Sequence, residues 1–183
     1  ADLVIADGVP IVWLARRIGW RDVHRITGIE LAERLLTKAI MENWRLYFLG
    51  AKPENLQKAM EHIGQRFGAP PIVGCPDGYF KAADIPQLIE SINTAKPDIL
   101  LLGMGIPQKE YFLADYIREL DVRFCITVGG AIDIWAGAKK RAPAVIQKMG
   151  LEWLYRGIYD LSRARLIMKY GLSFLKDLAR PPQ

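Results

Sequence analysis

Short, continuous apolar runs alternate along the chain with longer segments in which apolar residues recur every three or four positions. The apolar runs predict strands over residues 3–6, 46–49, 99–102 and 124–128. Helical spacing predicts helices that begin near Pro10 and Pro53, and helices over residues 29–43, 85–95 and 108–120. Runs that are apolar on both faces are typical of parallel strands covered by helices on both sides. The pattern therefore predicts an α/β fold with a doubly wound, mainly parallel, Rossmann-like sheet.

The C-terminal part of the chain follows a different pattern. Residues 143–180 contain no predicted strand and have the spacing of one or two basic amphipathic helices. The net charge of the chain is +5, but ten basic and three acidic residues lie from Lys139 onward, which leaves −2 for residues 1–138. We predict a Rossmann-like catalytic domain over residues 1–142 and a helical appendage over residues 143–183. The appendage would meet a polyanionic partner: phosphate, acidic lipid or nucleic acid.

Cysteine content and hydropathy indicate a cellular compartment. Cys75 and Cys125 are too few for a disulfide framework, and neither belongs to a C-x-x-C pair, so a reducing cytosol fits best. The sequence opens without a basic leader, and its longest apolar run, residues 99–106, is far shorter than the roughly 20 residues that cross a bilayer. We expect neither a membrane span nor an export signal.

Small residues and functional groups follow each predicted strand. Asp7-Gly8, Gly50-Ala51-Lys52, Gly103-Met104-Gly105 and Gly129-Gly130 would meet at the carboxyl edge of the sheet. Glycine there lets backbone amides approach a phosphate, and the next helix presents its positive N-terminus. The alternative is that glycine serves only the backbone angles of these turns. A diphosphate ligand is favoured, with Asp7 either a general base or the cap of the helix near Pro10.

Several common signatures are absent from the sequence. It contains no G-x-G-x-x-G, P-loop or G-x-S-x-G segment, which disfavours dinucleotide, nucleoside triphosphate and serine-nucleophile chemistry. It contains no Asp-x-Asp pair, and His24 and His62 stand apart from other metal ligands. We therefore expect metal-independent chemistry, with no metal and no cofactor.

Seven segments, taken in order, resemble a known enzyme family. They are residues 1–8 (ADLVIADG), 25–28 (RITG), 47–53 (YFLGAKP), 77–80 (DGYF), 97–107 (PDILLLGMGIP), 128–137 (VGGAIDIWAG) and the most distinctive block, 141–156. Together they resemble the WecG/TagA/CpsF glycosyltransferases over nearly the whole chain. The resemblance is strongest to the TagA branch.

The resemblance implies an inverting, metal-independent transferase that uses a UDP-activated sugar. In the TagA branch the donor is UDP-N-acetylmannosamine and the acceptor is undecaprenyl-diphosphate-N-acetylglucosamine, and the product starts the linkage unit of wall teichoic acid. The residues that match the sugar-diphosphate pocket are Arg25, Gln108 and Lys109, and those that match nucleoside contacts are Tyr79 and Asp133.

The resemblance also assigns the base and the appendage. Asp7 matches the proposed base, which would take the proton from the acceptor hydroxyl. Arg156 and Arg163 are seven positions apart, hence on one helical face, and would reach the substrate diphosphates. The appendage would dock on the anionic inner face of the cell membrane. The implied partners are a UDP-sugar, a polyprenyl-diphosphate-linked sugar and this membrane surface, with no nucleic acid, for a cytoplasmic, peripheral protein.

Two features depart from the family pattern. Members begin with a further strand that carries a Thr-x-Asn motif ahead of the segment matching Ala1, so we expect that strand, and part of the donor pocket, to be missing here. The segment Pro107-Gln108-Lys109-Glu110 differs from the usual Gln directly before Glu. This leaves open which of Gln108 and Lys109 faces the pocket.

Three alternative functions stay open at this point. One is a related UDP-hexose or uronate transferase for surface polysaccharide. Another is a Rossmann-type oxidoreductase, which the missing glycine fingerprint disfavours. The third is a basic-tailed module that binds nucleic acid or lipid. Homo-oligomerisation through the apolar faces of the tail is a further interpretation.

Overall fold

The computed structural model describes residues 4–149, 151, 152, 155 and 157. The chain divides into two compact units by its contacts. Unit 1 comprises Ala1–Thr27 with Arg141–Gln183, and unit 2 comprises Gly28–Lys140. The predicted functional division into residues 1–142 and 143–183 stays a prediction, because most of the appendage lies outside the described residues.

Unit 2 contains a four-stranded parallel sheet. Its strands are β1 (Leu46–Gly50), β2 (Ile72–Gly74), β3 (Ile99–Gly103) and β4 (Phe124–Thr127). Their order in the sheet is β2-β1-β3-β4, and every neighbouring pair is parallel. The predicted α/β fold with a parallel sheet is confirmed. The chain moves outward from β1 to β2 and then returns past β1 to β3, so the switch in strand order falls between β1 and β3.

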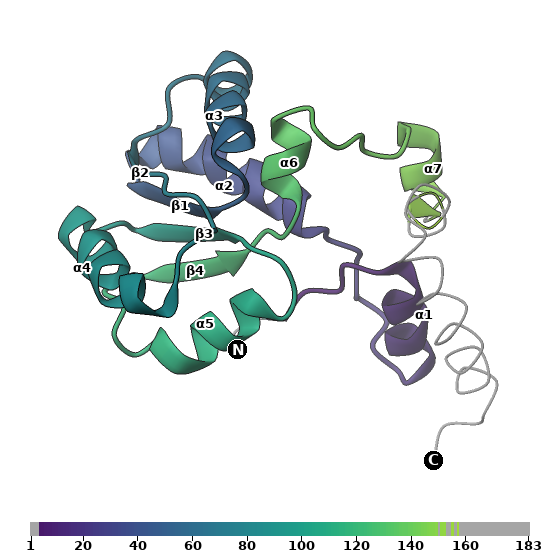
Figure 1. The fold of residues 1–183 in the computed structure, drawn as a ribbon. Helices are drawn as coiled ribbons and strands as arrows, with labels where there is room; N and C mark the ends of the chain where they lie inside the picture. Colours follow the sequence, from purple (N-terminus) through teal and green to yellow (C-terminus); the bar gives the residue numbers. More distant parts are fainter. Residues whose placement is uncertain (1–3, 150, 153–154, 156, 158–183) are drawn as a thin grey trace. The chain divides into compact units, whose positions relative to one another are not determined.

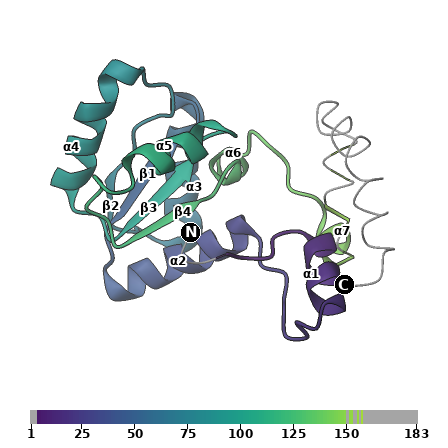
Figure 2. The ribbon, with the colours of Figure 1, turned by 90° about the horizontal axis from the view of Figure 1, so that it is seen from below.

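Helices cover both faces of this sheet (Figures 1 and 2). One face carries α2 (Gly28–Glu42), α3 (Pro53–Phe67) and α6 (Ala131–Trp135), and the other carries α4 (Ile85–Ala95), α5 (Gln108–Tyr116) and the short 3-10 helix η1 (Ala82–Asp84) beside α4. The helices predicted near 29–43, from Pro53 and over 85–95 are confirmed. The helix predicted over 108–120 ends four residues earlier, at Tyr116.

The alternation of side chains along the strands makes two cores, one on each face of the sheet. Leu46 and Phe48 pack with α2, α3 and α6, whereas Tyr47 and Leu49 pack with α4 and α5. The Phe48 and Trp135 rings meet edge to face with centroids 6.3 Å apart. Because every residue of β1 is buried, its apolar run has no polar position, as a central parallel strand requires.

One strand prediction was wrong, and one strand was not predicted. The strand predicted over residues 3–6 is not formed by its described part: residues 4–6 are in no strand, and the Val4 side chain is exposed. Ile26 N–H donates to the Ala6 carbonyl at 3.1 Å, but residues 4–6 pair with no strand of the sheet. The sequence reading also missed β2, a strand of three half-buried residues at the edge of the sheet.

Two helices of unit 1 are described from end to end. The first, α1 (Val9–Arg17), begins after Gly8 and carries Pro10 in its first turn, which confirms the helix predicted near Pro10. The second, α7 (Ala144–Lys148), starts where the helical appendage was predicted. In the part of the chain that the structure describes, no helix is both long and apolar enough to cross a membrane.

Candidate active site

Three glycines bring backbone segments together at the carboxyl edge of the sheet in unit 2. A Cβ atom on Gly50 would lie 2.5 Å from the carbonyl carbon of Gly103, and one on Gly78 would lie 3.0 Å from the Gly50 Cα. Gly50 also has a φ of 135°, which side-chain-bearing residues rarely adopt. Gly50 and Gly103 end β1 and β3 at the switch in strand order, where ligands of open α/β sheets bind, and Gly78 lies in the loop after β2. Glycine is therefore needed at these positions because another backbone segment passes close to its Cα atom, and not only because of the backbone angles of the turn.

The loop after β2 is fastened to the end of β1. Gly50 N–H donates to the Pro76 carbonyl at 3.2 Å, and Gly78 N–H donates to the Ala51 carbonyl at 3.1 Å. Within the loop, the Asp77 carboxylate accepts the backbone N–H of Tyr79 at 2.7 Å. The Tyr79 side chain is left exposed at this edge. An exposed aromatic ring held on a braced loop is suited to stacking on a flat ligand such as a base.

Gln108 and Lys109 lie differently at the start of α5. The Gln108 amide donates to the Gly78 carbonyl at 3.2 Å, which places its side chain against the loop that bears Tyr79. The Lys109 side chain is nearly buried, with its ammonium 3.0 Å from a carboxylate oxygen of Glu110. That hydrogen bond lowers the pKa of Glu110. Of these two neighbouring side chains, Gln108 is therefore the one that the structure joins to the glycine-rich edge.

Asp133, in the first turn of α6, accepts hydrogen bonds from two side chains. The Asn55 amide donates to one carboxylate oxygen at 2.9 Å, and the Lys139 ammonium donates to the other at 2.5 Å. Asn55 lies in the first turn of α3, directly after β1. Asp133 and the Tyr79 loop are thus both joined to the segment that follows β1. The N-termini of α3 and α5 lie at the same edge and favour an anion there.

The remaining described site residues lie in unit 1. Arg25 Nε donates to the backbone carbonyl of Asp7 at 3.1 Å, and Arg25 Nη2 donates to Glu152 Oε2 at 2.8 Å. Arg141 Nε lies 3.9 Å from the other Glu152 oxygen. Glu152 is buried, and its carboxylate lies between the partly exposed guanidinium groups of Arg25 and Arg141. The N-cap of α1 is Gly8, so Asp7 does not serve as the helix cap that the sequence left open.

The structure therefore brings the predicted residues together in two groups. Gln108 joins the Tyr79 loop in unit 2, and Arg25 joins Asp7 in unit 1. Arg156 and Arg163 lie outside the described residues. The sequence reading missed Glu152 and two partners of Asp133, the residues Asn55 and Lys139. Glu152 lies in the distinctive block 141–156 and is one of three acids among ten bases from Lys139 onward, but neither signal indicated that it pairs with Arg25.

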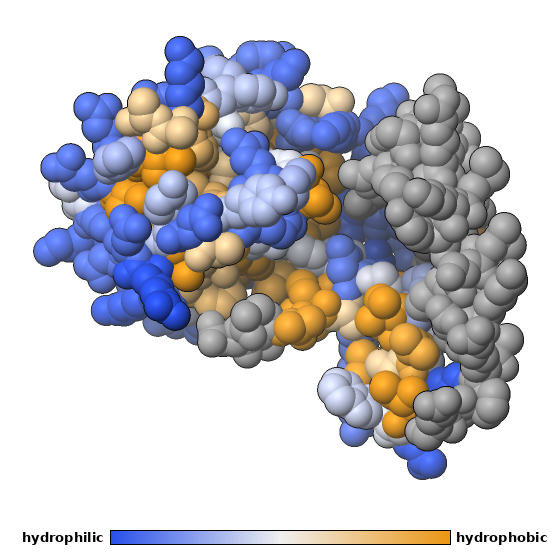
Figure 3. Space-filling view, turned by 60° about the horizontal axis from the view of Figure 1, so that its bottom comes forward, coloured by the Kyte–Doolittle hydropathy of each residue, from blue (hydrophilic) through white to orange (hydrophobic). Residues whose placement is uncertain are grey.

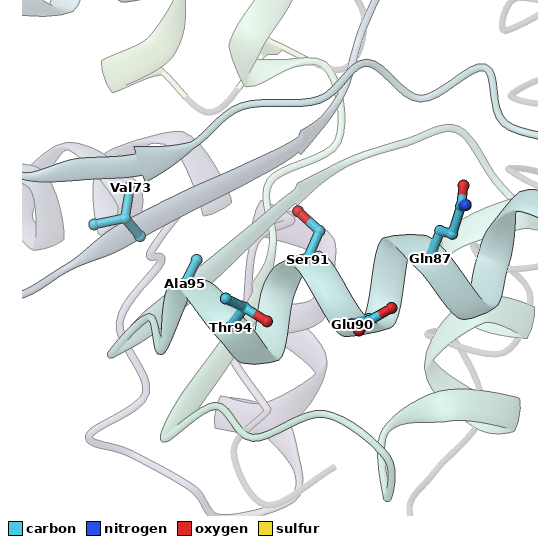
Figure 4. Close-up of a pocket in the computed structure, with 6 residues that line it drawn as sticks. All are labelled: Val73, Gln87, Glu90, Ser91, Thr94 and Ala95. Atoms are coloured by element: carbon cyan, nitrogen blue, oxygen red, sulfur yellow. The ribbon is translucent and has the colours of Figure 1, made fainter.

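A shallow, open depression of about 470 Å³ lies elsewhere, between α4 and the edge strand β2 (Figure 4). Its lining side chains come from α4, except for Val73 of β2: they are Val73, Gln87, Glu90, Ser91, Thr94 and Ala95. The lining holds one ionisable group, Glu90, and none of the predicted site residues. It lacks the paired acid, base or nucleophile that catalysis requires.

Two further observations limit the chemistry of the described residues. Burial raises the pKa of the Cys125 thiol to about 12, so this thiol stays protonated at neutral pH and is a poor nucleophile. No three His, Cys, Asp or Glu side chains among the described residues are grouped as metal ligands would be. The candidate functional residues are therefore the polar side chains described above at the carboxyl edge of the sheet in unit 2 and around Asp7 and Arg25 in unit 1.

Removing the charge of Glu152 tests its contribution to unit 1. Glu152→Gln keeps the shape of the side chain but leaves Arg25 and Arg141 without their buried counter-charge. We expect the free energy of unfolding in urea to fall by about 2 kcal/mol, since both arginines keep some contact with solvent. The control Glu42→Gln removes an exposed pair with Lys38 and is expected to change stability by about 0.5 kcal/mol or less. Equal losses in the two variants would show that the Glu152 contacts do not stabilise the unit.

Comparison with known proteins gives a consistent match. A model of the glycosyl transferase WecG/TagA/CpsF family matches residues 1–181. Relatives from Staphylococcus aureus strains NCTC 8325 / PS 47, COL and MRSA252, each named N-acetylglucosaminyldiphosphoundecaprenol N-acetyl-beta-D-mannosaminyltransferase, are 33% identical to the chain over 165 residues. The matched region is 89% of the chain, and the chain spans 63% of the length of each of these relatives.

Proposed function

Because this chain belongs to the WecG/TagA/CpsF family of glycosyltransferases, we propose that it transfers N-acetylmannosamine from UDP-N-acetylmannosamine to undecaprenyl-diphosphate-N-acetylglucosamine. The observation that carries the proposal is the family match over residues 1–181. The name of the S. aureus relatives supports the choice of sugar and of lipid acceptor. The product would be the start of the wall teichoic acid linkage unit.

The carboxyl edge of unit 2 is the proposed donor site. Backbone amides near Gly50 and Gly103 and the N-termini of α3 and α5 would receive the diphosphate of UDP. Tyr79 would stack on the uracil ring, and Asp133 would accept a hydrogen bond from the ribose. Gln108 would contact the sugar diphosphate, which its bond to the Gly78 carbonyl supports, since that bond keeps the amide beside the glycine loops. Lys109 is the less favoured contact, because its ammonium is turned to Glu110.

The proposed reaction is a single inverting displacement. Asp7 removes the proton from the acceptor hydroxyl while that oxygen forms a bond to the anomeric carbon, and the bond from this carbon to the UDP oxygen breaks. The negative charge that develops on UDP would be stabilised by Arg25 and, from the appendage, by Arg156 and Arg163. Guanidinium groups in these positions would supply the charge that other transferases take from a metal, so we propose a metal-independent reaction.

The lipid acceptor sets the proposed location. A polyprenyl diphosphate resides in a membrane, so the protein would work as a peripheral enzyme at the inner face of the cell membrane, with residues 143–183 as the docking appendage. Its partners would be the UDP-sugar, the lipid-linked sugar and an anionic membrane surface. Homo-oligomerisation stays a subsidiary proposal.

A transfer assay with defined substrates tests the proposal. The chain is incubated with UDP-N-acetylmannosamine and lipid-linked N-acetylglucosamine in the presence of EDTA, and the disaccharide lipid and its anomeric configuration are measured. We expect an inverted product at an unchanged rate with and without EDTA. UDP-glucose and UDP-glucuronate serve as competing donors, and preferential use of either would replace the proposed donor with that of the related surface-polysaccharide transferases.

A further inference from the structure

Helix α1 and the turn that follows it expose large apolar side chains. Ile11, Trp13, Ile18 and Trp20 are 50%, 56%, 54% and 67% exposed, and Val12 is the only residue of α1 that is buried. Figure 3 shows apolar side chains gathered at the lower right, where α1 lies. Two exposed indoles within eight residues are unusual for a water-facing helix, because each leaves a large apolar area in water.

The same segment carries only positive charge. Arg16, Arg17 and Arg21 are all exposed, and residues 9–21 contain no aspartate or glutamate. Exposed tryptophan with nearby arginine is the composition of helices that lie in the headgroup region of a bilayer, where the indole meets both apolar chains and polar headgroups. Charge complementarity therefore selects an anionic partner for this surface.

The segment is held in shape by its own hydrogen bonds. The backbone N–H of Trp20 donates to the Ala15 carbonyl at 2.9 Å, and the Arg16 guanidinium donates to the Val23 carbonyl at 3.1 Å. These bonds fold the turn back on the last turn of α1 and hold the backbone of Trp20 beside the helix. Binding would thus order few additional residues, which lowers its entropic cost.

We propose that α1 and the turn through Arg21, named here the α1 surface, dock on the headgroup region of an anionic lipid bilayer. This assigns membrane binding to the N-terminal segment, in addition to the appendage at 143–183. The proposal rests on the proposed function in one respect, the lipid-linked acceptor. Asp7 lies two residues before α1, so docking of the α1 surface would hold the candidate base at the level of the headgroups, where the acceptor sugar is linked to its lipid.

Vesicle sedimentation with the full chain tests the α1 surface. The vesicles contain phosphatidylcholine with or without phosphatidylglycerol and hold no acceptor lipid, so the readout does not depend on transferase activity. We expect binding to the anionic vesicles to fall by about tenfold in Trp13→Ser/Trp20→Ser. Arg21→Gln is expected to weaken binding by about fivefold at low salt. The controls are Tyr111→Ser, an equally exposed aromatic residue of α5, and Arg34→Gln, an exposed arginine of α2.

A second measurement keeps the proposal testable if the serine variant folds poorly. Brominated lipids quench the fluorescence of tryptophan that enters a bilayer, and we expect quenching of the wild-type chain to be mostly lost in Trp13→Phe/Trp20→Phe while vesicle binding is kept. Full quenching in that variant would overturn the proposal and place another tryptophan at the membrane. Unchanged vesicle binding with a shift from dimer to monomer in Trp13→Ser/Trp20→Ser would also overturn it, and would make the α1 surface a contact between two copies.

Different results would contradict the proposed sugar transfer and the proposed membrane docking of the α1 surface. Vesicle binding that depends on Trp13 and Trp20, in a chain that transfers no sugar, would support the α1 surface and count against the proposed reaction. If the chain transfers sugar to a water-soluble acceptor analogue but binds vesicles equally well without these tryptophans, the proposed reaction is supported and the proposed docking of the α1 surface is contradicted.

Discussion

Replacing Asp7 with asparagine is expected to lower the rate of sugar transfer by about 100- to 10,000-fold while leaving the affinity for UDP unchanged. Asparagine keeps the size of the side chain and its ability to accept a hydrogen bond, but it cannot take a proton from the acceptor hydroxyl. The proposed uracil, ribose and diphosphate contacts of the donor site lie in unit 2, and the Asp7 carboxylate is assigned to the acceptor hydroxyl and not to UDP. The two measurements are single-turnover transfer with lipid-linked N-acetylglucosamine and calorimetric titration with UDP.

The matched control is Asp22→Asn, which removes the same charge from an exposed aspartate of the same unit. We expect this variant to transfer sugar at the wild-type rate. A loss of transfer as large as that of Asp7→Asn would attribute the effect to the net charge of unit 1. Full activity of Asp7→Asn would contradict the role of Asp7 as the base.

Gly50→Ala is expected to destabilise unit 2 by about 4 kcal/mol. Two causes add: alanine rarely adopts a φ of 135°, and the new methyl group would lie 2.5 Å from the carbonyl carbon of Gly103 on the neighbouring strand. The clash is with backbone, so no side-chain rotation relieves it. β1 and β3 would have to separate at the proposed diphosphate site, and we expect the affinity for UDP to fall with stability. Unfolding in urea and UDP titration at low temperature measure the two effects.

Gly64→Ala is the control for that experiment. Gly64 lies inside α3, and a methyl group there would meet no heavy atom within 4 Å. Alanine is the better helix former, so this variant is expected to gain about 0.5 to 1 kcal/mol. If Gly50→Ala were as stable as wild type, close approach of the two strands would not explain the glycines at their ends.

Much of the fold follows from the hydrophobic pattern, and the exceptions have physical causes. The central strand β1 is buried along its length and β3 is buried from Ile99 to Leu102, so their apolar runs are unambiguous. β2 has only three residues and follows Pro70 and Pro71. It is a strand because it pairs with β1, and the local sequence pattern does not indicate this pairing. The run over residues 3–6 is as apolar as a strand, but pairing depends on a neighbouring backbone that local sequence does not indicate.

The candidate site was predictable where topology alone places residues together. Because the carboxyl ends of parallel strands meet at one edge, Gly50, Gly103 and Gln108 were expected there, and their contacts lie there. Glu152 was not predictable, because it meets Arg25 across 127 positions of sequence. The choice between Gln108 and Lys109 also depended on the structure, since both stand in the same turn of α5 and only their partners differ.

Binding of a uridine diphosphate by this chain underlies the whole proposed reaction, and calorimetric titration without added metal measures it. The chain is titrated with UDP and, in a separate experiment, with NADH. We expect saturable binding of UDP, weakened in Gly50→Ala, and no heat of binding with NADH. Binding of NADH with no response to UDP would rule out the proposed transferase and favour the oxidoreductase that the same sheet could support.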